Sequence, residues 1–491
     1  MPLATLLKDV KPSYEGLFRE NQELKKQLRD AVLALPTPRL NEVLNITERF
    51  EEDLFDVGNE PGRVSTVTDD KAIIWFSAQC VQSFLSYGKT WTSWIHCAFH
   101  HPTFERECAA FLGGGTNSAN ADDRHPFWLA VFFSFMCATL IFMDEDELIA
   151  SGASADLSLL HNWYDSALYF LHQGDYLRNH DMRTVQAVAI LGIVFTNMGD
   201  SKLQSLIWSS AIRIAQSLRM DDDRANLRES AIATQVRRRL WWTLVICEWL
   251  PVPYRAPCIT AADFNVDIPT IVDDDELDAV AVELNNSPRP VEYHLQMIKI
   301  SRLIHSFRSS LRQTDGQTRQ VSNLVLRTDE ALAEIIESLP SHLQMHQVPT
   351  DEALAGEKHS PWIAWQRLNL SLSLLYYRIV INRVLQDQWF QDPETFARTR
   401  AICLSSAQGI ISLSAQFDTS LARHRPWSTT VLLFSAGIIL AVEARFHASD
   451  EQGRYSKEIE RCVQFLHGVK NQSVIAARAV AILESQKSYI P

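Results

Sequence analysis

The sequence predicts an all-α protein, a large helical bundle arranged around a central block at residues 160–278. Apolar residues recur at three- and four-residue steps along most of the 491 residues, which is the period of a helix with one buried face. No stretch of the sequence sustains the alternation of apolar and polar residues that is expected of a half-buried strand. The hydrophobic share of 46% and the aromatic share of 10% are sufficient for a large core.

The N-terminal region predicts a short coiled coil over residues 14–35. A seam in alternating four- and three-residue steps is formed by Leu17, Asn21, Leu24, Leu28, Ala31 and Leu35. A polar Asn inside such a seam favours a two-stranded register, so we expect a homo- or heterodimer through this segment. The alternative is a single amphipathic helix packed on the rest of the protein, because three heptads are the lower limit for a coiled coil.

The chain divides into three expected parts. Pro36 and Pro38 end the N-terminal pattern, and the stretch that follows is mixed and acidic. We therefore expect an N-terminal helix at 1–36, a linker at 37–71 and one all-helical domain at 72–491.

Two runs early in this domain have a marked composition. The apolar run at 127–143 predicts a fully buried helix, which the acidic run at 144–147 ends in solvent. The glycine-rich run at 113–126 predicts a loop. Its glycines follow a predicted helix and no Lys-Ser or Lys-Thr pair accompanies them, so a phosphate-binding loop is disfavoured.

The central block predicts an antiparallel pair of core helices on either side of Gly199 and Asp200, followed by a third helix. In the third, an arginine triplet passes directly into a pair of tryptophans: Arg237, Arg238, Arg239, Trp241 and Trp242. We expect a structural role for all five, with the tryptophans in the core and the arginines paired with acidic loop residues such as Asp221 to Asp223. Contact between the arginines and phosphate is the alternative.

Further helices are predicted over 291–311, 320–339, 362–387, 394–416, 427–446 and 455–484. The most apolar segment among them, 431–442, is shorter than the roughly 18–20 residues that a membrane-spanning helix needs. We therefore expect a core helix there and no membrane contact.

Charge and cysteine usage limit the class of protein. The net charge of −13, from 46 basic and 59 acidic residues, is unlike that of a domain that grips the DNA backbone by itself. No two of the eight cysteines lie closer than eleven residues, so the spacing of a zinc cluster or zinc finger is absent from this chain. Most cysteines lie in apolar helical patterns, and with no secretory leader we expect reduced thiols in the nucleus or the cytoplasm.

Several separated segments together resemble a known family. The segments "RTVQAVAIL", "SAIRIAQSLRM", "RRRLWWTL" and "VDIP" occur in this order, with "WTSWIHCAFHHPTFEREC" upstream and "LYYRIVINRVL" downstream. They resemble the middle homology region of fungal zinc-cluster transcription factors, over residues 75–445. The chain departs from the family pattern at Glu248, where an Asp is usual, and at Arg255-Ala256-Pro257, where Gly-Arg-Pro is common.

This resemblance implies an all-α regulatory domain that senses or relays a signal, without a cofactor or a metal. It implies a nuclear transcriptional regulator, of a biosynthetic gene cluster, that has a small-molecule effector. DNA would be contacted through a partner or through a zinc cluster that this chain lacks. A ligand-binding corepressor is a further alternative.

An enzymatic alternative depends on acidic residues. Asp274, Asp275 and Asp278 fit the Asp-Asp-x-x-Asp pattern with which class I terpene cyclases hold Mg²⁺, and Asp222 with Asp223 forms a looser variant. A second metal motif of that class is missing.

Fungal humulene synthases resemble repurposed members of the same family. That resemblance implies a cytoplasmic, Mg²⁺-dependent sesquiterpene cyclase in which Lys299 holds the diphosphate of farnesyl diphosphate. His96 and His100 share a predicted helix face but lack a third metal ligand, so we expect a structural role at a helix end.

Overall fold

The computed structural model describes residues 41–55, 65–113, 125–153, 157–251, 257–277, 287–314, 318–345, 360–416, 421–446 and 449–487. Across these ranges the regular structure is helical, and the one isolated β-bridge among them joins Asp222 to Asn265. The predicted all-α class is therefore confirmed. The expected coiled coil at 14–35 lies outside the described residues.

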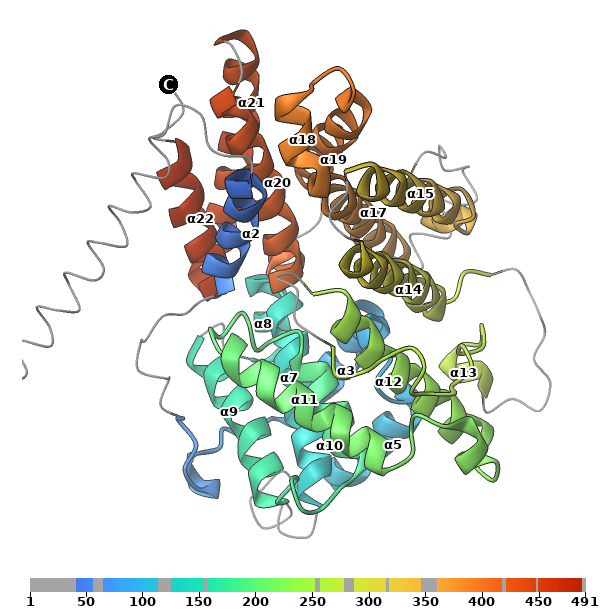
Figure 1. Cartoon of the computed structure of the whole chain (residues 1–491). Helices are drawn as coiled ribbons and strands as arrows, with labels where there is room; N and C mark the ends of the chain where they lie inside the picture. The colour runs from blue at the N-terminus through green and yellow to red at the C-terminus, as the bar shows by residue number, and fades with distance from the viewer. Residues whose placement is uncertain are drawn as a thin grey trace, which may run out of the picture.

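The helices form two packed halves (Figure 1). The first half contains α3 (Ala78–Trp91), α4 (Ser93–His96), α5 (His101–Gly113), α7 (Pro126–Phe142), α8 (Glu145–Ser151), α9 (Leu157–Gln173), α10 (Met182–Leu191), α11 (Ser201–Ser217), α12 (Ala231–Trp249) and α13 (Asp274–Leu277). The second half contains α14 (Val291–Gln313), α15 (Thr318–Glu337), α17 (Trp362–Asn382), α18 (Gln386–Gln391), α19 (Ala397–Gln416), α20 (Trp427–Phe446), α21 (Ser449–Val469) and α22 (Val474–Lys487). The first helix that the structure describes, α2 (Asn41–Phe55), lies with the second half.

The core of the first half is α7, which packs against α3, α9 and α10. Every residue from Phe127 to Phe142 is buried, which confirms the helix predicted from the apolar run. The acidic run follows the end of α7, with Glu145 and Asp146 exposed as expected, and it also starts the next helix. Asp144 and Glu147 exchange side-chain-to-backbone hydrogen bonds of 2.9 Å, so this run forms the capping box that starts α8.

The central block has the predicted antiparallel pair, α10 and α11, which pack against each other. α10 ends at Leu191, and consecutive turns extend from there to Gly199. α12 starts six residues before Arg237, where the Ser230 hydroxyl accepts the Ala233 amide at 3.2 Å. The Ser230 cap explains this start, because it satisfies an otherwise unpaired amide of the first turn.

Two predicted helices of the second half are each divided. The helix predicted over 362–387 is interrupted by a 3₁₀ turn at Arg383–Leu385, and the one over 455–484 by a turn at Lys470–Gln472. α20 is the one described helix long and apolar enough to cross a membrane, but 83% of its apolar window is buried inside the protein. It packs against α2, α19, α21 and α22, which agrees with the predicted core helix.

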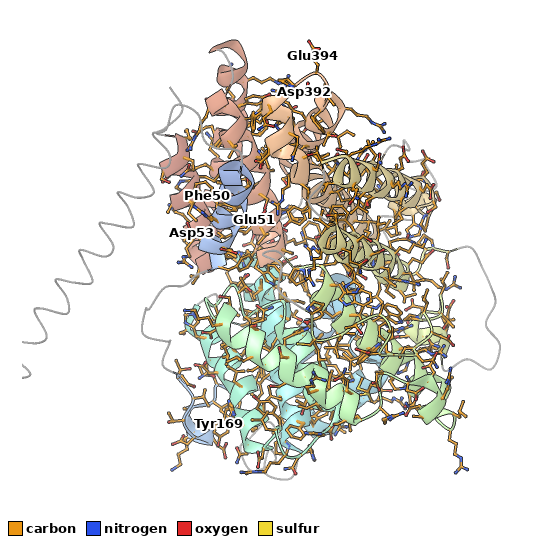
Figure 2. The ribbon with its side chains drawn as sticks, in the orientation of Figure 1. Phe50, Glu51, Asp53, Tyr169, Asp392 and Glu394 are labelled. Carbon is orange, nitrogen blue, oxygen red and sulfur yellow. The ribbon has the colours of Figure 1, made fainter. Side chains whose placement is uncertain are left out.

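The expected linker at 37–71 contains α2, and this corrects the predicted boundary. Phe50, Glu51 and Leu54 of α2 are buried, and the helix packs against α20 and α22. Figure 2 labels Phe50 and Glu51 on this helix. The acidic composition concealed an apolar face, because the buried positions Thr47, Phe50, Glu51 and Leu54 follow the i, i+3, i+4, i+7 spacing of a helix.

A buried ion pair fixes α2 in place. Both carboxylate oxygens of Glu51 accept hydrogen bonds from Arg383, at 2.6 and 2.8 Å, and Ser435 of α20 donates to the same carboxylate at 2.8 Å. Glu51 is fully buried, so the loss of these partners would leave a polar group unpaired in the core.

Candidate functional site

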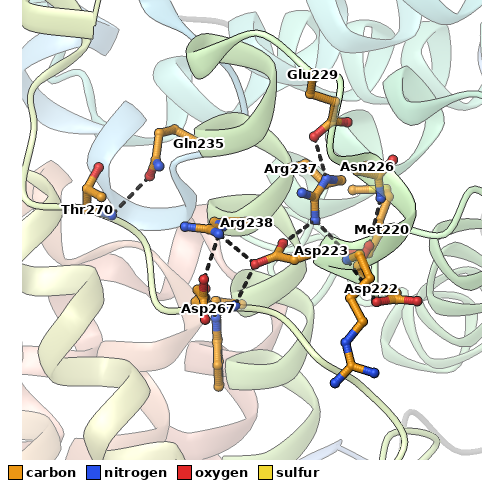
Figure 3. Close-up of polar contacts among 12 residues, drawn as sticks. Met220, Asp222, Asp223, Asn226, Glu229, Gln235, Arg237, Arg238, Asp267 and Thr270 are labelled. Atoms are coloured by element: carbon orange, nitrogen blue, oxygen red, sulfur yellow. Dashed lines mark hydrogen bonds and ion pairs between the residues drawn. The ribbon is translucent and has the colours of Figure 1, made fainter.

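The N-terminal part of α12 is attached to the loops on either side by its arginines (Figure 3). Arg237 donates from Nε to Glu229 at 2.8 Å and from Nη1 to Asp223 at 2.9 Å. Arg238 donates from Nη2 to the other Asp223 oxygen at 2.7 Å and to Asp267 at 2.8 Å. Asp223 therefore bridges two arginines, which confirms the predicted pairing of the triplet with this acidic loop.

The electrostatics of Asp223 keep it ionised. Burial raises the pKa of its carboxyl group, but the Asp267 amide and the guanidinium groups of Arg238 and Arg237 outweigh burial and hold the pKa below its ordinary value. The Arg237 side chain is only 3% exposed. A buried guanidinium group with two carboxylate partners is not available to an external phosphate, so the structure favours the structural role.

Arg239 holds a third loop. Its Nη1 donates to Asp274 Oδ1 at 2.5 Å and its Nη2 to the Val272 carbonyl at 2.6 Å. The second Asp274 oxygen accepts the backbone amide of His101 at 2.8 Å, and His100 Nε2 lies 2.9 Å from the Asp274 carbonyl oxygen. Asp274 thus connects α12 to the start of α5, and His100 has the helix-end role expected from the sequence.

The two tryptophans are in the core as predicted. Trp241 is 0% exposed and Trp242 is 3% exposed. Phe264, from the segment that crosses α12, packs edge-on against both rings, with centroids 5.5 and 5.4 Å away. Trp242 Nε1 also donates to the Asp267 carbonyl at 3.0 Å.

The residues named for the cyclase alternative do not form a diphosphate site. Asp223 and Asp274 are bonded to arginines as described above, and Asp222 caps a turn by accepting the Arg224 amide at 3.0 Å. Asp275 pairs with Lys89 on the surface, Asp278 lies outside the described residues, and Lys299 is exposed. Within the described ranges, no group of three or more His, Cys, Asp or Glu side chains could hold a metal. The structure therefore does not support this alternative.

The C-terminal end of α12 is held by the second half of the protein. Arg308 of α14 donates from Nη1 to the Trp249 carbonyl at 2.7 Å. The Tyr377 hydroxyl of α17 donates to the Leu250 carbonyl at 3.0 Å. These bonds satisfy carbonyl groups that a helix end leaves free, so α12 connects the two halves.

A cavity of about 390 Å³ lies beside this end of α12. Its wall is formed by residues of α2, α4, α7, α11, α12, α14, α17 and α20 and the turns after α10, and therefore by both halves. Nine aromatic side chains contribute: Phe55, Trp94, Phe142, Trp208, Tyr293, Trp365, Tyr376, Tyr377 and Trp427. The volume is in the range of sites for small organic ligands.

The cavity wall carries little charge. Glu248 is the one acidic residue among the described wall residues, and no lysine or arginine is among them. Burial lowers the pKa of the wall histidines, to about 4 for His96 and to about 3 for His294. Both rings are therefore neutral near pH 7, and this wall offers no cation to a carboxylate or phosphate.

Sequence analysis did not identify the cavity. Trp208, Trp427 and Tyr376 occur in apolar helical patterns, where an aromatic residue is expected in a filled core. The space between them depends on how helices of the two halves pack, which periodicity does not specify. Two wall residues had a signal: Glu248 as a departure from the family pattern, and His96 as a weighed metal ligand.

Comparison with protein families gives one match. The model of the "Fungal specific transcription factor domain" matches residues 82–337, which is just over half of the chain. The matched range begins in α3 and ends with α15, so it includes α12 and crosses both halves.

Curated relatives are similar over part of their own length. The agnestins biosynthesis cluster transcription factor AgnL11 of Paecilomyces divaricatus is 22% identical, over 67% of this chain and 50% of its own. The probable transcription factor lepB of Aspergillus flavus is 21% identical, over 77% and 70%. Transcription factor TAS2 of Pyricularia oryzae is 24% identical, over 62% and 41%. The chain thus spans about half the length of the first of these relatives.

A solved structure has a similar fold. The K. lactis CBF3 core aligns with a TM-score of 0.56 over 92% of this chain and 90% of its own, at 15% sequence identity. At this identity the likeness concerns the arrangement of helices alone.

Proposed function

Since the chain belongs to the fungal specific transcription factor domain family, we propose that it acts as a fungal transcriptional regulator and that the residues described here form its regulatory part. The observation that carries this proposal is the family match over residues 82–337, which includes the arginine-anchored helix α12. Three curated relatives, each named as a transcription factor, support it.

We further propose that the regulated genes belong to a biosynthetic cluster. The printed name of one relative refers to the agnestins biosynthesis cluster, and the other relatives leave the target genes open. Nuclear localisation follows from the same proposal, because a regulator of transcription acts on chromatin.

DNA contact in this proposal does not use the arginine triplet. Arg237 and Arg238 are bonded to carboxylates of the same chain, and the chain as a whole carries a net charge of −13. Affinity for the DNA backbone comes from basic side chains that displace counterions. We therefore propose that DNA is bound through a partner protein or a zinc cluster outside this chain, with residues 14–35 as the dimer contact.

Deletion of the gene in the native fungus tests the proposal. Transcript profiling is expected to show changed mRNA levels for a coherent set of neighbouring biosynthetic genes, and complementation with the wild-type gene is expected to restore them. Unchanged transcripts under conditions where the cluster is expressed would contradict the proposed function.

A transcription assay in a heterologous host adds an independent readout. The full chain is fused to an unrelated DNA-binding domain upstream of a reporter gene. We expect reporter output to change relative to the DNA-binding domain alone. The Arg237→Leu substitution is expected to abolish this change, because it destabilises the fold. A fusion without effect on the reporter would argue against a regulatory domain.

A further inference from the structure

Polar atoms in the cavity wall fall into two groups that differ in their partners. Trp427 Nε1 donates to the Gly192 carbonyl at 2.9 Å, and the Tyr377 hydroxyl donates to the Leu250 carbonyl. Trp208 Nε1 and the Tyr376 hydroxyl have no hydrogen-bond partner, although their side chains are only 6% and 3% exposed. The same two residue types therefore occur in one wall with and without partners.

A third wall residue has one unpartnered atom. His294 has a hydrogen bond to the backbone of Arg239, whereas its Nε2 has none, and the residue is 1% exposed. Buried polar groups in folded proteins are nearly always hydrogen-bonded. These three groups belong to the wall of one cavity, where a bound molecule can accept hydrogen bonds from the Trp208 indole and the Tyr376 hydroxyl, whereas Nε2 of neutral His294 can only accept.

We propose that this cavity binds a neutral, flat and largely apolar small molecule that accepts hydrogen bonds from the Trp208 indole and the Tyr376 hydroxyl. The nine aromatic side chains offer stacking surfaces. An indole N–H can only donate, so the ligand needs an acceptor such as a ketone oxygen. The wall has no lysine or arginine among its described residues, so an anionic ligand lacks a counter-charge.

The position of the cavity connects binding to both halves of the protein. Its wall includes Thr243 and Ile246 of α12, Met297 of α14 and Leu432 of α20. A molecule bound there contacts helices of both halves at once and stabilises their packed arrangement. The role of the ligand as effector rests on the proposed function as a regulator. Binding of the ligand to the cavity can be measured independently of that function.

Three probes with one ring system test the proposal on the purified full chain. 9-Fluorenone is neutral with one carbonyl acceptor, fluorene lacks the acceptor, and 9-fluorenone-2-carboxylate adds a negative charge. In ligand-observed NMR titrations we expect 9-fluorenone to bind about tenfold more tightly than fluorene, because fluorene has no acceptor for the Trp208 and Tyr376 donors. The carboxylate is expected to bind more weakly than 9-fluorenone.

Variants assign the binding to the cavity. Ser373→Phe places a ring in the wall and is expected to abolish binding of 9-fluorenone; Ser405→Phe is its control, because Ser405 is an exposed helix serine with a similar bond to the backbone. If Ser373→Phe fails to fold, Ser209→Phe on α11, which is also a wall residue, takes its place.

Matched aromatic variants test the hydrogen bonds. Tyr376→Phe and Trp208→Phe are expected to remove the tenfold preference for 9-fluorenone over fluorene, whereas Tyr377→Phe and Trp427→Phe are expected to keep it. Equal affinity of the two probes for the wild type, or unchanged binding in the Ser373→Phe variant, would overturn the proposal.

Failure of this proposal and failure of the proposed function give different results. If the probe does not bind but transcripts change in the deletion strain, the proposed ligand site is rejected and the proposed regulatory function is retained. If the probe binds in the cavity but transcripts do not change, the proposed ligand site is retained and the proposed regulatory function is rejected.

Discussion

The two ends of α12 are held by different kinds of hydrogen bond. At the N-terminal end, each arginine of the triplet is bonded to a carboxylate of a neighbouring loop. At the C-terminal end, carbonyl groups are bonded to Arg308 and Tyr377, and beside them lies a cavity whose wall keeps unpartnered polar atoms. The first end is fixed by ion pairs, and the second lies beside the cavity in which we propose that a ligand binds.

The largest effect is expected at the N-terminal end of α12. Arg237→Leu removes a buried guanidinium group and its charge-assisted hydrogen bonds to the half-buried carboxylates of Asp223 and Glu229, and we expect it to lower the free energy of unfolding by about 3 kcal/mol. Thermal and urea unfolding of the full chain measure the change. Arg178→Leu is the control, because Arg178 is 84% exposed in its pair with Asp175, and its effect is expected below about 1 kcal/mol.

The next effect concerns pH at the cavity end. The pKa of His294 is lowered from 6.5 to about 3 by burial, so the unfolded chain binds a proton below pH 6.5 that the folded protein does not. The stability contribution of neutral His294 is therefore complete above pH 6.5 and is lost progressively as pH falls towards 3. We expect a loss of about 1.4 kcal/mol per pH unit within this window.

His294→Gln isolates that contribution. The variant is expected to have a smaller loss of stability than the wild type between pH 6.5 and pH 4.5, measured by urea unfolding at each pH. Parallel profiles for the two proteins would show that His294 is already protonated in the folded state, and would contradict its assigned neutrality.

Two adjacent tyrosines sharpen the comparison further. Tyr377→Phe removes the hydroxyl that donates to the Leu250 carbonyl, and we expect a loss of about 1 kcal/mol in the free energy of unfolding. Tyr376→Phe removes a hydroxyl without a partner, so no loss is expected. Equal destabilisation by both substitutions, in thermal unfolding without ligand, would show that the Tyr376 hydroxyl has a structural partner.

The smallest effect concerns adjacent aspartates near the start of α13. Asp275 is 62% exposed and pairs with Lys89, so Asp275→Asn is expected to change stability by less than about 0.5 kcal/mol. Asp274→Asn removes the charged partner of the buried Arg239 and is expected to cost several times more. Differential scanning fluorimetry of both variants measures the contrast, and similar melting temperatures would contradict the assigned roles.

The sequence predicted the parts of this fold that depend on local pattern. The buried run of α7, the position of Trp241 and Trp242, and the pairing of Asp223 with the arginines follow from apolar periodicity and from charge at the border of a helix. The predicted linker at 37–71 was wrong over α2. Acidic residues dominate the composition of this helix, and the partners of its narrow buried face lie 332 to 424 residues away in sequence.

The candidate site was beyond sequence analysis for the same reason. Tyr376 and Tyr377 are the same residue type in the sequence, but only the Tyr377 hydroxyl has a hydrogen-bond partner. The difference arises because the end of α12 brings the Leu250 carbonyl near Tyr377. At Asp274 and Asp275 the sequence suggested a site that the structure does not support. Its spacing suggested a metal site, whereas Arg239 and Lys89, remote in sequence, provide the counter-charges.

The packing of α2 has a consequence for the way the polypeptide is assembled. Because Glu51 is bonded to Arg383 and Ser435, α2 is anchored to the last helices of the protein, although the first half follows it directly in sequence. A truncation that removes α20 and α22 would remove the helices against which α2 packs, although the break lies almost four hundred residues away in sequence.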